Sequence, residues 1–431
     1  MESTTYNAYV QILKGELVPA LGCTEPGAVA YAAAKAVSVL GTFPDRIEIS
    51  CSGNIVKNVK GVVVPNSGGL RGIEAAAVLG AVVGKADNML EVLNHVERPD
   101  IDKTKQLLGT GFCRCLLEEG EGNLYIDVLA EGGGHSARTV IKDSHTNIIL
   151  IQKDGETSYS KDCDDADESA AEMKKLLNVK DILNFADTLQ VEDVKEILDH
   201  QMKVNTAIAE EGLAHEYGAA VGKTLLEAYG DDIKIRAKAK AAAGSDARMG
   251  GSSMPVVINS GSGNQGITVT VPVVEYAKEL GADDDRLYRA LAVSNLISIH
   301  IKRHIGKLSA FCGAVSAACG SGAAITWLMG GGYDQVSSTI TSTLANVGGI
   351  VCDGAKASCA AKIASSLDAA ILANSMTFQK RAFQEGEGIV DGDIEKTIEN
   401  IGHIGREGMK FTDTEILHLM IGDREPGCVC D

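Results

Sequence analysis

Aromatic side chains are scarce in this sequence: Phe, Trp and Tyr together make up 4% of its 431 residues, with a single Trp. Long apolar runs are also lacking, since no stretch reaches the ~18 uninterrupted apolar residues of a membrane-spanning helix. The first twenty residues have no basic start followed by an apolar core, which argues against a secretory signal. We therefore expect a cytoplasmic protein that does not use a membrane as partner.

Positive charge is in short supply as well. Lys and Arg number 40 against 58 Asp and Glu, which gives a net charge of −18. Nucleic acids and anionic membranes need concentrated basic residues, so neither is expected as a partner. The apolar share of 45% and the 48 glycines instead indicate a folded protein of closely packed helices and many turns, and the length suggests two or three domains.

Helices and strands are both predicted in the first part of the chain. Tyr6 to Leu17 and, after Pro26, Ala28 to Val39 are predicted as helices, and Arg46 to Ser50 alternates as a strand does. Four more strands are predicted further on, separated by Gly-rich or polar turns: Cys113 to Leu117, Leu124 to Ala130, Thr139 to Ile141 and Asn147 to Gln152.

The sequence pattern becomes almost entirely helical after the charged stretch from Lys161 to Glu172, because long Ala-rich segments with helical periodicity follow as far as Ile371. We therefore predict an α+β protein with two domains. Residues 1–165 would form a mixed α/β, sandwich-like domain, and residues 166–431 a mainly α-helical domain. Ala-rich helices of this kind are compatible with a homodimer.

The 11 cysteines are odd in number and widely scattered, which fits a reducing compartment better than a disulfide scaffold. No CxxC pair is present. Some cysteines have no spacing that requires chemistry, and we interpret them as buried free thiols: Cys51, Cys113, Cys115 and Cys163.

Three later cysteines, Cys312, Cys352 and Cys359, lie among Gly and polar residues. Asp353-Gly354 is typical of a turn, so Cys359 should lie in the early turns of a helix, where the dipole favours the thiolate. The bent chain could aim Cys352 and Cys359 at one site. Cys319 lies two helical turns beyond Cys312 and is expected in the core.

Three thiolate ligands would leave one metal position open for a substrate. Thiolates select soft metals, so zinc competes with an iron–sulfur cluster, and buried thiols without a metal are an equally good interpretation of the spacing alone.

Cys23 needs a separate interpretation. It lies between Pro19 and Pro26, in a constrained loop before a helix, where a thiol can be partly exposed and activated. A nucleophile, a general base, a metal ligand and an inert thiol in a tight connection all remain open.

The stretch from Asn259 to Gly266 is a dense loop of amide and small residues. Such loops expose successive backbone N–H groups and often begin helices, which suits a carboxylate or phosphate. The loop matches neither a P-loop nor a dinucleotide fingerprint. We predict that Asn259, Ser260 and Asn264 bind a substrate carboxylate; the alternative is a plain connecting turn.

The combination of several motifs resembles the L-cysteine desulfidase family, over nearly the whole chain. The segments that carry the resemblance are GCTEPGAVAYAAAKA, SGNIVKNVKGVVVPNSGG, INSGSGNQGITVTVPV, KLSAFCGAVSAACGSGAAI and GGIVCDGAKASCAAKIASS. The helical half is similar to the α-domain of iron–sulfur L-serine dehydratases. The resemblance implies a 4Fe–4S cluster held by Cys312, Cys352 and Cys359, with Cys23 as proton acceptor. It also implies conversion of L-cysteine and water to pyruvate, ammonia and sulfide.

Three other activities remain as alternatives. An iron–sulfur L-serine dehydratase would use the same residues, and a zinc-stabilised binding protein would use the same cysteines without turnover. A pyridoxal-phosphate lyase is disfavoured because no phosphate cup with a Schiff-base Lys is evident. Cys430 could cap an open iron, as a C-terminal cysteine does in some serine dehydratases, although a flexible tail carrying Cys428 and Cys430 is our expectation.

Overall fold

The computed structural model describes residues 1–21, 24–121, 124–161, 166–306 and 309–422. The chain forms two compact units. The helical unit consists of residues 1–22, 165–352 and 356–407, and the sheet unit of residues 23–164, 353–355 and 408–431. The prediction of a mixed α+β protein is confirmed. The first 22 residues group with the helical unit, apart from the sheet unit that follows them.

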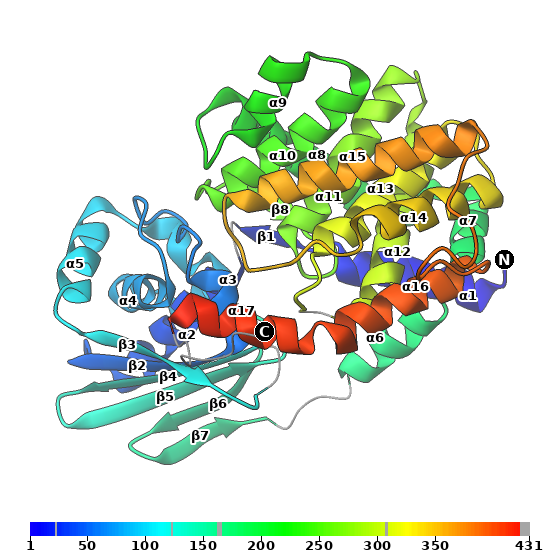
Figure 1. Ribbon diagram of the computed structural model, residues 1–431. Helices are drawn as coiled ribbons and strands as arrows, with labels where there is room; N and C mark the ends of the chain where they lie inside the picture. The colour runs from blue at the N-terminus through cyan, green and yellow to red at the C-terminus, as the bar shows by residue number, and fades with distance from the viewer. Residues whose placement is uncertain (22–23, 122–123, 162–165, 307–308, 423–431) are drawn as a thin grey trace, which may run out of the picture. The chain divides into compact units, whose positions relative to one another are not determined.

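The sheet unit is built on a six-stranded sheet of order β3-β2-β4-β5-β6-β7, in which only β2 and β3 are parallel (Figure 1). Its strands are β2 (Arg46–Ser52), β3 (Cys113–Glu118), β4 (Tyr125–Gly132), β5 (His135–Lys142), β6 (Ile148–Lys153) and β7 (Glu156–Ser160). Its helices are α2 (Thr24–Leu40), α3 (Gly53–Val59), α4 (Ile73–Val83), η1 (Ala86–His95), α5 (Arg98–Leu108) and α17 (Lys410–Ile421).

Period-two alternation places one face of this sheet against helices. Ile47, Ile49 and Cys51 of β2 are buried, whereas Glu48 and Ser50 between them are partly exposed. Helix α2 packs against β4, β5 and β6, and α4 packs against α2 and β3. The buried face therefore forms the core of the unit, and the opposite face is polar.

The helical unit contains most of the remaining elements. They are α1 (Ser3–Glu16), β1 (Pro19–Leu21), α6 (Ala166–Lys175), α7 (Val179–Thr188), η2 (Val191–Asp193), α8 (Lys195–Ala214), α9 (Val221–Tyr229), α10 (Ile233–Met249), β8 (Pro255–Val257), α11 (Gly263–Glu279), α12 (Asp284–Ile305), α13 (Gly313–Leu328), α14 (Tyr333–Val347), α15 (Ser358–Phe378) and α16 (Ile394–His403). The short π-helical turn η3 (Ile404–Gly408) ends the unit. Among the described residues, no helix combines the length and apolarity needed to span a bilayer.

A two-stranded pairing ties the N-terminus to the helical unit. Strand β1 runs antiparallel to β8, with Ala20 opposite Val256. The pairing continues through a hydrogen bond from the N–H of Ile258 to the carbonyl of Val18, at 3.0 Å. This pairing of segments far apart in sequence explains why the first residues belong with the later helices.

Four helices of this unit, α10, α11, α13 and α15, form a ring of contacts in which each helix packs against the next. Pro272 lies inside α11 and has no N–H for the carbonyl of Thr268 four residues earlier. The hydroxyl of Ser321, on α13, donates to this carbonyl. The hydrogen bond that Pro272 cannot donate is therefore replaced by one that joins α11 to α13.

Candidate active site

Two of the three predicted ligands lie on short extended segments that pair with each other. Phe311 and Val351 form an antiparallel bridge. The N–H of Cys312 donates to the carbonyl of Ile350 at 3.0 Å, and the N–H of Cys352 donates to the carbonyl of Ala310 at 2.6 Å. Cys312 and Cys352 are therefore held on neighbouring strands of backbone.

Two of the three cysteines stand at the beginnings of helices. Cys312 is the N-cap residue of α13, and Cys359 is the second residue of α15. Before α15 the chain turns at Gly354, whose φ of +92° suits glycine. The predicted turn at Asp353-Gly354 and the early-helix position of Cys359 are both confirmed.

The three thiols are close enough to influence one another electrostatically. Burial, followed by negative charge on Cys352 and Cys359, raises the pKa of Cys312 to about 12. Burial also raises the pKa of Cys359, against the lowering effects of the Lys356 N–H, the Lys362 ammonium and the Arg248 guanidinium. The positive groups at the start of this helix thus act on Cys359 in the predicted direction, and burial opposes them with the larger effect.

Cys319 lies deeper in α13 and is fully buried among small residues. Burial raises its pKa. Its expected place in the core is confirmed.

The amide and glycine loop leads directly into helix α11, as its composition predicts. Ser262 caps the helix by accepting a hydrogen bond from the N–H of Gln265, at 3.4 Å. Asn259 and Ser262 also exchange backbone hydrogen bonds of 3.1 and 3.0 Å, which close the loop.

Asn259 is held within a buried network of polar side chains. Its Nδ2 donates to Oδ1 of Asn295 at 3.0 Å, and its Oδ1 accepts from the hydroxyls of Ser260 and Ser298, each at 3.0 Å. Gln201 bonds the amide of Asn295 in turn, with two contacts of 2.9 Å. Asn259 therefore fixes the loop to α8 and α12.

The other two predicted loop residues differ from Asn259. Ser260 has a φ of +49°, an uncommon backbone conformation for a residue with a side chain. Asn264 is half-buried, and its Oδ1 has no hydrogen-bond partner among the described residues. Of the three predicted substrate-binding residues, Asn264 is therefore the one with a buried side-chain oxygen that accepts no hydrogen bond from the described residues.

Gln265, the residue after Asn264, was not among the predicted substrate-binding residues, although it lies within the same run of amides. Gln265 is 5% exposed, and its Oε1 has no partner among the described residues. Its amide group lies against Gly313, where a Cβ would come within 2.6 Å of Cδ. The loop and Cys312 are therefore neighbours.

The contacts place the C-terminus of α10 and the N-termini of α11, α13 and α15 at one end of the four-helix ring. The Gln265 side chain, at the start of α11, contacts Gly313 at the start of α13. Negative charge on Cys359, at the start of α15, raises the pKa of Cys312. Cys23, Cys163, Cys428 and Cys430 lie outside the described residues, so what was predicted for them stays a prediction.

The donor set at this end suits a cysteine-ligated cluster. Each cysteine of a 4Fe–4S cluster ligates a different iron, so its thiols stand further apart than those around one ion. No group of three His, Cys, Asp or Glu side chains in the described part of the chain is arranged around a single metal ion. The three thiols lie within electrostatic range of one another. The N–H groups of Ala314 and Lys356 are directed at sulfur, and the ammonium of Lys362 adds positive charge. These features suit an anionic cluster.

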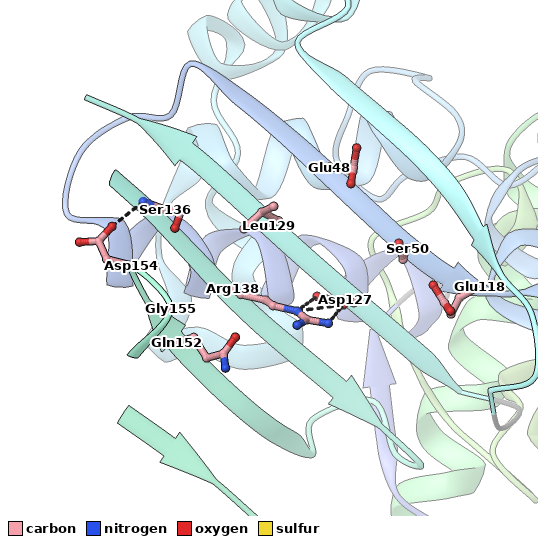
Figure 2. A pocket seen from close by; sticks show the side chains of 10 residues that line it. All are labelled: Glu48, Ser50, Glu118, Asp127, Leu129, Ser136, Arg138, Gln152, Asp154 and Gly155. Atoms are coloured by element: carbon pink, nitrogen blue, oxygen red, sulfur yellow. Dashed lines mark hydrogen bonds and ion pairs between the residues drawn. The ribbon is translucent and has the colours of Figure 1, made fainter. Parts of the chain in front are cut away.

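A separate depression of about 410 Å³ lies on the polar face of the six-stranded sheet (Figure 2). Figure 2 shows the guanidinium of Arg138 directed at the carboxylate of Asp127, with Nε–O distances of 2.9 and 3.1 Å. This pairing raises the pKa of Arg138. The depression contains three further carboxylates, of Glu48, Glu118 and Asp154, and no cysteine among its described lining residues. Asp154 contacts His135, and the depression lacks the chemistry of the cysteine-bearing end.

Comparison with known proteins places the chain in a family. Residues 87–418 match the family described as serine dehydratase alpha chain. This protein belongs to that family. A UPF0597 protein of Lachnoclostridium phytofermentans is 51% identical over 96% of this chain and 100% of its own length. UPF0597 proteins of Desulfitobacterium hafniense and Treponema denticola are 50% and 45% identical, over 96% and 98% of this chain and 97% and 100% of their own lengths.

The part that matches the serine dehydratase alpha chain contains Cys312, Cys352, Cys359 and the whole loop from Asn259 to Gly266. Cys23 lies before it, in the sequence that precedes residue 87. The family match thus covers the convergent end of the four-helix ring, and the assignment of Cys23 depends on other arguments.

Proposed function

We propose that this protein is an iron–sulfur-dependent L-cysteine desulfidase, a carbon–sulfur lyase that converts L-cysteine and water to pyruvate, ammonia and sulfide. The observation that carries the proposal is the convergence of Cys312, Cys352 and Cys359 beside the amide loop, in the region that matches the serine dehydratase alpha chain.

In this proposal the three cysteines hold a 4Fe–4S cluster and leave one iron without a protein ligand. When bound, the cluster supplies a Lewis acid that makes the substrate's sulfur a better leaving group. Cys312, Cys352 and Cys359 would hold the cluster as thiolates.

The chain's own residues carry the remaining steps. The N–H groups at the start of α11 hold the substrate carboxylate, with Asn259 and Ser260 shaping the loop and Asn264 facing the ligand. Cys23, as thiolate, removes the α-proton, and the electron pair of the broken C–H bond forms the C=C bond as sulfide leaves. The resulting aminoacrylate then reacts with water to give pyruvate and ammonia.

Dehydration of L-serine is the second candidate, and the family description favours it. The two activities share every residue named here and differ in the leaving group. Comparing kcat/KM for L-cysteine and L-serine with the same anaerobic preparation decides between them; a higher value for L-serine overturns the desulfidase assignment.

The cluster assignment is tested by anaerobic purification, a visible spectrum and counts of iron and acid-labile sulfide. A complete cluster gives about four of each per chain. Cys312→Ala should lose the colour and the activity, whereas Cys319→Ala, a matched change on the same helix, should keep both. A colourless wild-type protein with one zinc ion and no turnover would support the zinc-stabilised binding protein instead.

The role of Cys23 is tested with Cys23→Ala. The variant should retain the full visible spectrum and lose elimination activity. Full activity with an intact cluster would remove Cys23 from the mechanism without affecting the cluster assignment.

A further inference from the structure

The extended segment that leads to Cys312 makes two sets of contacts within the helical unit. The first is its antiparallel bridge with the segment around Val351. The second is made with η3, the π-helical turn that ends the unit, through a hydrogen bond between Ser309 and Gly405. This second set acts on the residues directly before the proposed cluster ligand.

Ser309 is the residue that links the segment to η3. Its hydroxyl donates a hydrogen bond to the carbonyl of Gly405, at 2.7 Å, and accepts one from the N–H of Phe311, at 3.0 Å. One partly buried hydroxyl therefore satisfies a backbone donor next to Cys312 and attaches that stretch of backbone to η3.

Glycine at position 405 allows η3 to lie close to this segment. A Cβ on Gly405 would come within 2.9 Å of Cγ2 of Ile305 and 3.3 Å of Cβ of Phe311, so even a methyl group would push the turn away. Gly402 packs on α12 in the same manner, since its Cβ would lie 2.4 Å from Cβ of His304. The end of α16 and η3 are thus packed tightly against the end of α12 and against Phe311.

The π-helical form of η3 is a second indication of a special role. A π-helical turn hydrogen-bonds across five residues, is rare, and occurs mostly as a single turn at functional sites. In this protein the carbonyl that receives the Ser309 hydroxyl belongs to the π-helical turn. The irregular turn therefore occurs where the helix meets the segment that carries Cys312.

We propose that Ser309 and η3 position the cluster ligand Cys312. The Ser309 hydroxyl fixes the backbone of Phe311, and its bond to Gly405 restrains that backbone, so the thiol of Cys312 keeps its place in the ligand set. Groups hydrogen-bonded behind a metal ligand commonly contribute about 10–100-fold to metal affinity. This inference rests on the proposed function for the identity of the bound group.

The test measures the half-life of the cluster's visible absorbance when the anaerobic holoprotein is mixed with an iron chelator. Ser309→Ala removes both hydrogen bonds, and the half-life should shorten about 10-fold. Ser309→Thr keeps a hydroxyl and should restore most of it. The matched control is Arg406→Gln in the same turn: Arg406 donates to the carbonyl of His304, away from the segment before Cys312, so the half-life should not change.

A second variant changes the other partner of the contact. Gly405→Ala introduces the methyl group that would collide with Ile305 and Phe311, and it should also shorten the half-life. Melting temperatures separate positioning from general stability. A merely structural role for Ser309 would lower the melting temperature of Ser309→Ala and leave the half-life unchanged at temperatures well below unfolding.

Hydrogen exchange of the metal-free full chain tests the same arrangement without the cluster. In Ser309→Ala the amides of Phe311 and Cys312 should exchange faster than in the wild type, because the backbone before the ligand has lost its restraint. In Arg406→Gln their exchange should be unchanged. Mass spectrometry of peptides that cover residues 309–313 provides this measurement.

An unchanged half-life in folded Ser309→Ala overturns the inference, as does an equal loss in Arg406→Gln. If Ser309→Ala does not fold, an unchanged half-life in Gly405→Ala overturns it. A colourless wild type refutes the proposed function; faster exchange in Ser309→Ala would then still support the positioning of Cys312, and unchanged exchange would overturn it. A wild type with a complete cluster, beside unchanged half-life and exchange in Ser309→Ala, would refute the inference and leave the proposed function standing.

Discussion

Replacing Asn259 by Ala separates a scaffold role for this residue from direct contact with substrate. The Asn259 side chain donates to Oδ1 and to the backbone carbonyl of Asn295, at 3.0 and 3.3 Å, and accepts from Ser260 and Ser298. At about 1 kcal/mol net for each of the three bonds of 3.0 Å, the substitution should destabilise the protein by about 3 kcal/mol. A loss of this size lowers the melting temperature of a unit this large by about 9 °C.

The assay is thermal unfolding of the holoprotein together with KM for L-cysteine, and Asn264→Ala is the matched change in the same loop. Because Oδ1 of Asn264 has no partner among the described residues, its removal should leave the melting temperature nearly unchanged and raise KM. The opposite pattern would refute this reasoning: a stable Asn259→Ala with a raised KM, beside an Asn264→Ala with a normal KM, would mean that Asn259 contacts the substrate.

Three further predictions concern other parts of the fold. Ser321→Ala should lower the free energy of unfolding by about 1–2 kcal/mol in chemical denaturation, because the carbonyl of Thr268 would then lack its donor beside Pro272; an unchanged value would mean that water replaces the hydroxyl. Burial, followed by the charge of nearby Arg303, lowers the pKa of His304 to about 4. The unfolded chain therefore takes up this proton first as the pH falls from about 6.5 to 4, and stability should decrease there by about 1–3 kcal/mol; His304→Leu should flatten that part of the stability profile, and an unaltered profile would contradict the assignment. The pKa of Cys51 is raised well above its usual range by a hydrogen bond with Cys115 and by burial. Iodoacetamide should therefore modify Cys51 only after unfolding, which peptide mapping would show. Rapid modification of Cys51 in the native protein would contradict this.

Local pattern was sufficient for the elements whose two faces differ. The strand at Arg46 to Ser50 was predicted from alternation, and β2 covers it, with buried Ile47 and Ile49 on one face. Strand β7 was missed because all five of its residues are exposed, so it has no buried face to produce an alternating pattern. The three-residue strand Pro19–Leu21 was also missed, since its partner lies more than two hundred residues away and no local signal specifies it.

The candidate site was predictable to the extent that residue chemistry is unusual. Cysteines beside glycine and a run of amide residues can be recognised from the sequence alone, and the structure brings Cys312 and Gln265 together. The electrostatic effect of Arg248 on Cys359 could not be predicted in this way, because Arg248 is one of several basic residues on the Ala-rich helix α10, and neighbours such as Lys234 and Lys238 have the same appearance in sequence. Only the tertiary packing shows that Arg248 is buried against Gly263.

The absence of a CxxC pair follows from how the fold assembles the site. Cys312 and Cys359 are recruited from the starts of two different helices, and Cys352 from the extended segment that returns to the first of them. Between Cys312 and Cys352 the chain runs out along α13 and back along α14, two helices of 16 and 15 residues. The spacing of these cysteines in sequence is therefore set by the length of a helical hairpin. Converging helix starts place backbone N–H groups around the thiols, so the same arrangement that hides the site from motif searches supplies the positive potential that an anionic cluster and a carboxylate both require.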